Sequence, residues 1–343
     1  MTATKRKAVL CDTIFSPQLE QLARNGLRDW TSLEIVNLIH APKDHEKLAA
    51  LLADADAVTC DPVTEISTDV INRMMNCKII VTLSTGYDHI DLEAASRKGI
   101  YVCCVQNYCV EEVADHTLSL ILNVSRKIQR LNKNIELGRW EDYQSVGPVH
   151  RLRGRTLGLI GVGKIGKAVA ERARAFGLQV VAFDPYVPAG SLTDITLMGL
   201  EDVLHRADII SIHSALTNET KGMISSKQFE EMKNGVFIIN CARGAIIDAN
   251  ALAEAIRSGK VAGAGLDVFE KEPPDPQEQL LHMDAVFVTP HVAYLSIEAD
   301  LDRQRIPVEE IARVWKGERP MGVVNLNKLE RLGRLPEVRK ATG

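Results

Sequence analysis

The first hundred residues alternate between two patterns of apolar and polar positions. Short apolar runs, typical of buried strands, occur at Ala8–Cys11, Leu33–Leu38, Ala57–Cys60, Ile79–Leu83 and Ile100–Cys103. Apolar residues recur at helical spacing in the segments between them, Asp44–Leu52, Asp69–Met75 and Leu92–Ser96. Because strands that alternate with helices form parallel sheets covered by those helices, this region predicts a parallel α/β domain.

The same alternation begins again at Thr156. The expected strands of this second series are Thr156–Ile160, Gln179–Phe183, Asp208–His213, Gly235–Asn240, Val261–Leu266 and Ala285–Thr289. The expected helices include Glu201–His205, Ser226–Met232, Ala249–Ser258 and Glu278–His282. The sequence therefore predicts an α/β fold with two parallel-sheet domains.

Segments outside the two series are helical or charged. One continuous helical pattern runs from about Val110 to Leu137, and its apolar surface exceeds what a linker needs. It could pack within one subunit or form an arm against a second subunit. A further helix, Ile297–Trp315, has no strand of the second series left to accompany, so we expect it to return to the first domain. The chain then ends in Gly317–Gly343, where the basic residues Arg331, Arg334, Arg339 and Lys340 are predicted to lie in a solvated terminus.

Composition limits the possible partners. A chain of 343 residues has room for about two domains. Its formal net charge of −4 gives no basic footprint, so we expect neither nucleic acid nor an anionic membrane as a partner. The seven cysteines are odd in number and show no CxxC spacing, which is the pattern of reduced, cytoplasmic proteins. We find no metal-site motif.

The motif Gly161-Val162-Gly163-Lys164-Ile165-Gly166 lies between an expected strand and an expected helix. In a dinucleotide-binding turn, the first glycine allows the tight turn, the second admits the pyrophosphate and the third lets helix and strand pack closely. Asp184 follows 18 residues after Gly166, close to the usual position of an acid that binds the ribose 2′-hydroxyl. An acid there repels a 2′-phosphate, so we expect NAD rather than NADP. A phosphate-binding P-loop is disfavoured because Ala168 replaces the required Ser or Thr.

Three chemically active side chains follow later strands of the second series: Arg243, Glu272 and His291. Hydride transfer to a 2-keto acid needs this set. The guanidinium would hold the carboxylate and polarise the carbonyl, the imidazole would supply the proton, and the carboxylate would favour the charged imidazole. Taken singly, each has an ordinary reading, as a surface arginine, a capping acid or a loop histidine. The hypothesis depends on their sharing one sheet edge with the glycine turn.

From about Ile79 to Asn325, the chain resembles the D-isomer-specific 2-hydroxyacid dehydrogenases. The resemblance is carried by the trio above, the central glycine motif, Ser84-Thr85-Gly86-Tyr87-Asp88 and Val110-Glu111-Glu112-Val113-Ala114-Asp115-His116-Thr117. It implies that Arg243, Glu272 and His291 are catalytic. It also implies a flavodoxin-like substrate domain, residues 1–105 and 294–343, into which an NAD-binding domain, residues 106–293, is inserted. A homodimer would form through residues of about 110–150, and Asn107 would be the hinge.

The resemblance also assigns binding residues. The cofactor would contact the glycine turn (Gly161, Gly163, Lys164, Ile165, Gly166), Asp184, and a groove formed by Ser214, Ala215, Thr220, Cys241 and Ala242. Asp267 would meet the nicotinamide carboxamide. The substrate would contact Ser84, Thr85, Gly86 and Tyr294.

The expected function is therefore an NAD-dependent oxidoreductase that interconverts a 2-keto acid and a D-2-hydroxy acid. Both glyoxylate/hydroxypyruvate reductase-like and phosphoglycerate dehydrogenase-like substrates are compatible with it. The alternative is an NAD(H)-sensing scaffold resembling the C-terminal-binding proteins, which the aromatic Tyr294 and the stretch from Cys109 to Asp115 favour. Formate dehydrogenase is disfavoured, because that branch has Gln at the position of Glu272.

Overall fold

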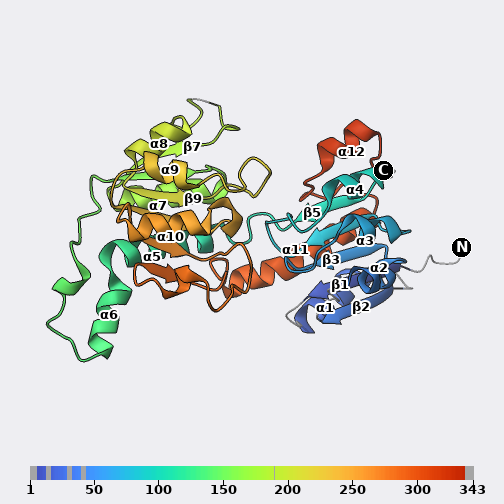
Figure 1. The fold of residues 1–343 in the computed structure, drawn as a ribbon. Coiled ribbons are helices and arrows are strands. Elements are labelled where there is room, and N and C mark those ends of the chain that lie inside the picture. Colours follow the sequence, from blue (N-terminus) through green and yellow to red (C-terminus); the bar gives the residue numbers. More distant parts are fainter. Residues whose placement is uncertain (1–5, 13–16, 29–32, 40–43, 189, 337–343) are drawn as a thin grey trace, which may run out of the picture. The chain divides into compact units, whose positions relative to one another are not determined.

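A computed structural model describes residues 6–12, 17–28, 33–39, 44–188 and 190–336. The chain divides into two compact units (Figure 1). The first unit comprises Met1–Tyr108 and Ile297–Gly343, and the second comprises Cys109–Ser296. The second unit is thus inserted into the first along the sequence. Asn107, close to the point where the chain passes between them, has a left-handed backbone with φ of 66°, which asparagine tolerates better than most residues.

The first unit is built on a five-stranded parallel sheet. Its strands are β1 (Arg6–Asp12), β2 (Leu33–Ile39), β3 (Ala57–Cys60), β4 (Ile79–Thr82) and β5 (Tyr101–Cys104). Their order, β2-β1-β3-β4-β5, is that of flavodoxin-like sheets. The helices are α1 (Pro17–Gly26), α2 (His45–Leu52), α3 (Thr68–Arg73), α4 (Leu92–Arg97), α11 (Ile297–Trp315) and α12 (Leu326–Leu332).

Alternate residues of these strands face opposite helix layers, as the two-residue period of a strand requires. Val9 and Ile80 pack with α2, α3 and α4 on one face. Leu10 and Ile79, their sequence neighbours, pack with α1, α11 and α12 on the other. The sheet is therefore buried on both faces, which explains why its strands appear in the sequence as continuous apolar runs.

The second unit contains a seven-stranded parallel sheet. Its strands are β6 (Thr156–Ile160), β7 (Gln179–Phe183), β8 (Thr196–Leu197), β9 (Ile209–Ile212), β10 (Val236–Asn240), β11 (Val261–Leu266) and β12 (Val286–Val288). The order β12-β11-β10-β9-β6-β7-β8 is a doubly wound dinucleotide-binding arrangement, which reverses at β6. The chain therefore has the predicted α/β class with two parallel sheets.

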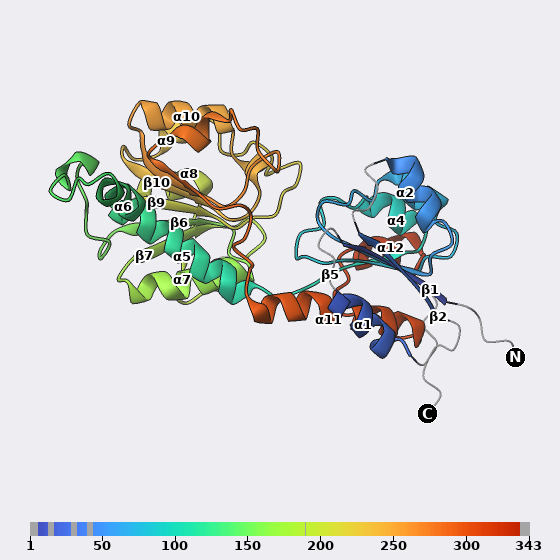
Figure 2. The ribbon, with the colours of Figure 1, turned by 90° about the horizontal axis from the view of Figure 1, so that it is seen from below.

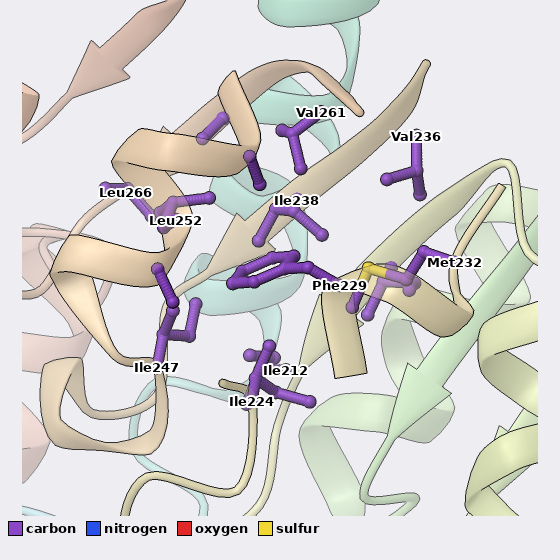
Figure 3. Packing of buried hydrophobic residues seen from close by; sticks show 14 of the residues in the cluster. Ile212, Ile224, Phe229, Met232, Val236, Ile238, Ile247, Leu252, Val261 and Leu266 are labelled. Atoms are coloured by element: carbon purple, nitrogen blue, oxygen red, sulfur yellow. The ribbon is translucent and has the colours of Figure 1, made fainter. Parts of the chain in front are cut away.

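Helices cover both faces of the second sheet, as Figure 2 shows. Helices α5 (Val110–Arg126) and α7 (Lys164–Ala175) pack on one face. The other face carries α8 (Leu200–Arg206), α9 (Ser226–Glu231) and α10 (Ala249–Arg257). In the core on this side, Phe229 lies among Ile238, Leu252 and Met232 (Figure 3). Burial of a side chain of this size stabilises the fold by about 1.5–3 kcal/mol.

The single helix predicted from Val110 to Leu137 was wrong. The chain forms α5 and then α6 (Ile128–Glu136), separated by Lys127, which is left-handed with φ of 57°. Neither Gly nor Pro marks the break in the sequence. It is held by tertiary contacts: the Lys127 ammonium and the Arg130 guanidinium both donate to the carbonyl of Val146.

One further expectation needs correction, and some elements were not predicted. Helix α12, which was not predicted, lies in the C-terminal region and buries Leu329, whereas Arg331 and Arg334 are exposed, as expected of a solvated terminus. The helix expected at Glu278–His282 is a 3-10 turn, Gln279–His282. Helix α1 and the short edge strand β8 were not predicted. Arg339 and Lys340, two of the basic residues predicted to lie in that terminus, are outside the described residues. Within the described residues, no helix is both long enough and apolar enough to span a membrane.

Candidate functional site

The glycine turn follows β6, the strand at which the sheet order reverses. Gly161 has φ of 94°, and a side chain there would lie 2.8 Å from the backbone of His213 and Ser214. A Cβ on Gly166 would lie 2.4 Å from the carbonyl oxygen of Gly161. A Cβ on Gly163, by contrast, would meet no atom of the described residues within 4 Å. The turn is therefore closed on the protein side and open at its second glycine, where a phosphate can approach.

Helix α7 begins at Lys164, directly after this open glycine. The first N–H groups of a helix have no partner within the helix, and its N-terminal end carries a partial positive charge. Lys164 is exposed, and Ile165 is half-buried in the first turn of the helix. This arrangement suits a pyrophosphate.

Asp184 follows β7, which pairs with β6. Its two carboxylate oxygens accept backbone N–H groups on different sides: Val162 donates to Oδ2 at 3.0 Å and Tyr186 donates to Oδ1 at 3.0 Å. The side chain is therefore held beside the glycine turn, and each oxygen keeps a lone pair for a further donor. A ribose diol would supply such donors.

The opposite side of the turn is the loop after β9. The hydroxyl of Ser214 is buried and has no hydrogen-bond partner among the described residues, which is costly unless a ligand satisfies it. Thr220 closes this loop by donating from Oγ1 to the carbonyl of Ala215 at 2.7 Å. The unpartnered hydroxyl and the open glycine both fit a dinucleotide at this place.

Cys241 and Ala242 follow β10, the next strand of the sheet. Burial raises the pKa of the Cys241 thiol to about 12, which keeps the thiol neutral. The N–H of Ala242 donates to Asn240 Oδ1 at 2.9 Å. These two residues present a short neutral edge between the glycine turn and Arg243.

His213, at the end of β9, was missed by sequence reasoning. Its Nε2 lies 2.8 Å from the hydroxyl of Ser211, and its backbone closes the glycine turn at Gly161. Burial lowers the pKa of its imidazole to about 4, so it is neutral at physiological pH. The sequence feature that could have indicated His213 is its position at the end of the expected strand Asp208–His213.

Arg243 opens the short 3-10 turn Gly244–Ile246 after β10. The amide of Asn240 donates to the Arg243 carbonyl at 2.9 Å. One guanidinium nitrogen, Nη1, donates to the carbonyl of Ala242 at 2.8 Å. These contacts orient a half-buried guanidinium at the carboxyl end of the sheet.

Glu272 and His291 meet although they follow different strands, β11 and β12. His291 Nδ1 lies 2.6 Å from Glu272 Oε2, and the N–H of Phe269 donates to Oε1 of the same carboxylate at 3.0 Å. Burial alone would raise the pKa of Glu272. This effect of burial is outweighed by the hydrogen bond and charge of His291, the N–H of Phe269 and the charge of Arg243, so the pKa of Glu272 is lowered. The structure therefore brings all three predicted residues to one edge of the sheet.

The backbone of His291 is left-handed, with φ of 53°. Non-glycine residues rarely adopt this conformation unless their surroundings hold them in it. Asp267, only 1% exposed, is the main support. Its carboxylate accepts Val292 N and Ala293 N, each at 2.9 Å, and its carbonyl accepts His291 N at 2.8 Å. Besides the cofactor contact expected of Asp267, the residue therefore shapes the histidine turn.

The predicted substrate residues are split between the units. Ser84, Thr85 and Gly86 belong to the first unit, at the end of β4, whereas Tyr294 is a half-buried residue of the second. The Ser84 hydroxyl donates to the Gly86 carbonyl at 2.7 Å, and the Thr85 hydroxyl donates to the Val105 carbonyl at 3.2 Å. Both hydroxyls thus shape the loop, which leaves the N–H groups of this tight turn as the groups suited to an anion.

The glycine turn, the acid after β7 and the trio at the ends of β10, β11 and β12 define a dinucleotide-binding oxidoreductase of the doubly wound α/β class. The chain belongs to the D-isomer-specific 2-hydroxyacid dehydrogenase family. Residues 118–293 match the model of that family described as its NAD binding domain. The resemblance inferred from the sequence is therefore confirmed, and so is NAD as the cofactor of this fold.

Relatives of this chain are named for different activities. The chain is 36% identical over 309 residues to the glyoxylate reductase of Thermofilum pendens, covering 85% of this chain and 89% of that protein. It is also 36% identical over 326 residues to the D-3-phosphoglycerate dehydrogenase of Archaeoglobus fulgidus, where the match covers 94% of this chain but 60% of the longer relative. Among solved structures, the D-lactate dehydrogenase of Aquifex aeolicus with NAD and lactic acid superposes with a TM-score of 0.80 at 28% identity, covering 95% of this chain and 98% of that one.

Proposed function

We propose that this protein interconverts a 2-keto acid and a D-2-hydroxy acid with NAD as the redox partner. The observation that carries the proposal is the 2.6 Å contact between His291 Nδ1 and Glu272 Oε2, with Arg243 at the same sheet edge as the glycine turn. Glyoxylate/hydroxypyruvate-type and phosphoglycerate-type substrates both remain within the proposal.

The proposed roles follow from the chemistry of each side chain. Bound NADH supplies the hydride. Arg243 holds the substrate carboxylate and polarises the carbonyl through its planar N–H donors. His291 gives a proton from Nε2 to the developing alkoxide, because Nδ1 is engaged with Glu272. The ionised Glu272 stabilises the charged imidazole and sets its orientation. In the oxidising direction the same imidazole accepts the proton.

The two units have different proposed roles. The second unit, with the glycine turn and Asp184, binds NAD, and the N–H groups of Ser84, Thr85 and Gly86 in the first unit bind the substrate carboxylate. Tyr294 lines the substrate pocket. We assign residues 1–105 and 294–343 to the substrate domain and residues 106–293 to the NAD domain, with bounds that differ by three residues at each junction from those of the compact units. We assign Asn107 to the hinge between the domains.

A homodimer through residues of about 110–150 is part of the proposal. Helix α6 has no buried residue, which is unusual for an amphipathic helix in a folded protein. The helix and the loop after it expose apolar side chains that a second copy can cover: Ile128 52%, Ile135 48%, Leu137 55%, Trp140 77% and Tyr143 64%. We expect the double substitution Leu137→Asp and Trp140→Asp to halve the mass measured by light scattering. Met75→Asp, at an apolar residue 73% exposed in the first unit, should leave the mass unchanged.

We also propose a cytoplasmic location. The seven cysteines, all within the described residues, form no disulfide, and six of them are buried. Reduced, buried cysteines are typical of proteins that fold in a reducing compartment. Alkylation of the protein in denaturant, directly after gentle lysis under non-reducing conditions, would test this, because buried free thiols then react whereas a disulfide-bonded pair does not.

A panel of 2-keto acids assayed with NADH and with NADPH tests the central proposal. It should include glyoxylate, hydroxypyruvate, its phosphorylated form, pyruvate and bulkier branched or aryl keto acids. We expect turnover of at least one keto acid with NADH, with a D-configured product. NADH binding without turnover of any keto acid would support the alternative, an NAD(H)-sensing scaffold, which the aromatic Tyr294 favours. A preference for NADPH would contradict the role of Asp184.

A further inference from the structure

Helix α5 holds the segment that carries His291 at two points. Glu112 and His116 lie four positions apart, so they share one face of the helix. The hydroxyl of Ser296 donates to Glu112 Oε1 at 2.7 Å. His116 Nε2 lies 2.9 Å from Thr289 Oγ1. One face of α5 therefore forms hydrogen bonds with both ends of the segment from Thr289 to Ser296, and His291 lies between these ends.

The direction of the His116 hydrogen bond follows from the proton on Thr289. A threonine hydroxyl has one proton, and Thr289 donates it to Asp267 Oδ1 at 2.6 Å. Thr289 Oγ1 can therefore only accept from His116, so the imidazole must carry its proton on Nε2. The result is a directed chain from His116 through Thr289 to Asp267. Asp267 in turn accepts the backbone N–H groups of Val292 and Ala293, the two residues that follow His291.

The neighbouring face of α5 contacts the cofactor-binding helix. Arg172 of α7 donates from Nε to Asp115 at 2.6 Å and from Nη2 to Glu111 at 2.5 Å. Helix α7 starts at the glycine turn. The same helix, α5, is thus hydrogen-bonded to the segment carrying the proposed proton donor and to the helix that would hold the pyrophosphate.

We propose that Glu112 and His116 are positioning residues that hold the His291 segment on helix α5, with His116 acting through Thr289 and Asp267. Neither side chain touches the reacting atoms in this arrangement. Their effect is to keep His291 in its left-handed conformation and within reach of Glu272. Since a displacement of about 1 Å at a catalytic group can cost on the order of 100-fold in rate, modest loosening should be measurable. The proposal rests on the proposed function, because His291 is the group being positioned.

The kinetic experiment compares three variants with the full-length protein. His116→Leu removes the donor at similar volume, and we expect kcat to fall about 10-fold, the effect of one buried hydrogen bond and its unsatisfied partner. The KM for NADH should change by less than about two-fold. His116→Gln places an N–H donor near the same position and should recover most of kcat. His205→Leu, at an exposed histidine paired with Glu231, is the control and should keep wild-type kcat.

A purely structural defect would lower activity without changing the rate-limiting step. We expect the solvent deuterium isotope effect on kcat to rise in His116→Leu, because proton transfer from a misplaced His291 becomes slower. Ser296→Ala removes a single hydroxyl at the other end of the segment and should reproduce the effect more weakly. It remains informative if His116→Leu fails to fold.

A spectroscopic experiment separates this proposal from the proposed function. The proton between His291 Nδ1 and Glu272 should give a low-field NMR signal, assigned by its loss in His291→Asn. We expect the signal to shift or broaden in His116→Leu and to persist in His116→Gln. This result requires no turnover, so a failed keto-acid panel would leave the positioning role supported by it. Wild-type kcat, isotope effect and low-field signal in His116→Leu would overturn the proposal.

Discussion

A methyl group on Gly244 would lie 2.0 Å from the carbonyl carbon of Phe269 and 2.3 Å from the nitrogen of Glu270. The turn that carries Arg243 therefore packs backbone against backbone on the loop that leads to Glu272. Only a residue without a side chain allows this approach. The guanidinium and the carboxylate are held near one another by this contact as well as by their charges.

Gly244→Ala should damage the site strongly, because neither neighbour is a flexible side chain that could move aside. We expect a loss of about 1–3 kcal/mol in the free energy of unfolding, as for other overpacked positions. We also expect kcat/KM to fall on the order of 100-fold, because Arg243 and Glu272 must separate. Urea unfolding and steady-state kinetics measure the two effects.

Gly199→Ala is the matched control for this substitution. A Cβ on Gly199 would meet only Asp202 Oδ2, at an ordinary 3.6 Å, and its backbone is in the extended region that other residues adopt. We expect near-wild-type kinetics and a stability change below about 1 kcal/mol. Equal damage from both alanines would show that the Gly244 contact has no special role.

His291→Ala should lower kcat by a factor on the order of 10²–10⁴, the usual contribution of a general acid–base group. The variant should still bind NADH, because the glycine turn and Asp184 are untouched, and fluorescence titration can verify this. Near-normal turnover would remove His291 from the mechanism.

Glu272→Gln should change the pH dependence of the reaction and leave the fold intact. The pKa of Glu272 is lowered in the folded protein, so its carboxylate stays ionised to a lower pH than that of an ordinary glutamate. The stability that its pair with His291 contributes is fully present above the ordinary pKa and is lost as the pH falls through the lowered pKa. A neutral amide cannot favour the charged imidazole. In the direction of keto-acid reduction, we expect the limb of the kcat/KM profile that reports the proton donor to move to lower pH. A profile that coincides with that of the wild type would contradict the role of the carboxylate.

Asp184→Asn should weaken discrimination against NADPH. The substitution removes the negative charge that repels a 2′-phosphate but keeps an oxygen that can accept one of the two N–H groups from Val162 and Tyr186. We expect the ratio of kcat/KM values for NADH and NADPH to fall by about 10-fold or more, with the larger change in the KM for NADPH. Asp194→Asn is the control, because Asp194 forms an exposed ion pair with Arg174 in the same unit. An unchanged ratio in Asp184→Asn would place the selectivity elsewhere.

The residues that follow strands were the part of the site that the sequence predicted most directly. Arg243, Glu272 and His291 each follow an apolar run, and parallel strands bring their carboxyl ends to one edge. The contact between His116 and Thr289 was not accessible, because it depends on which face of α5 meets the end of β12. The break at Lys127 also lacked a sequence signal, since it is set by the distant carbonyl of Val146. Local pattern therefore predicted the elements, whereas the supports of the site depend on tertiary packing.

His213 should make folding stability depend on pH in a defined window. Its pKa is lowered to about 4 in the folded protein because burial disfavours the imidazolium. An unfolded histidine titrates near 6.5, so between about pH 6.5 and pH 4 the unfolded chain binds more protons, and stability falls as pH drops. This one group should cost about 2–3 kcal/mol between pH 7 and pH 4.5. Urea unfolding measures the free energy of unfolding at both pH values, and the loss between them should be smaller by that amount in His213→Gln than in the wild type. His205→Gln, at an exposed histidine, should lose as much as the wild type. Identical differences in all three proteins would mean that His213 titrates normally in the folded state and is not held neutral beneath the glycine turn.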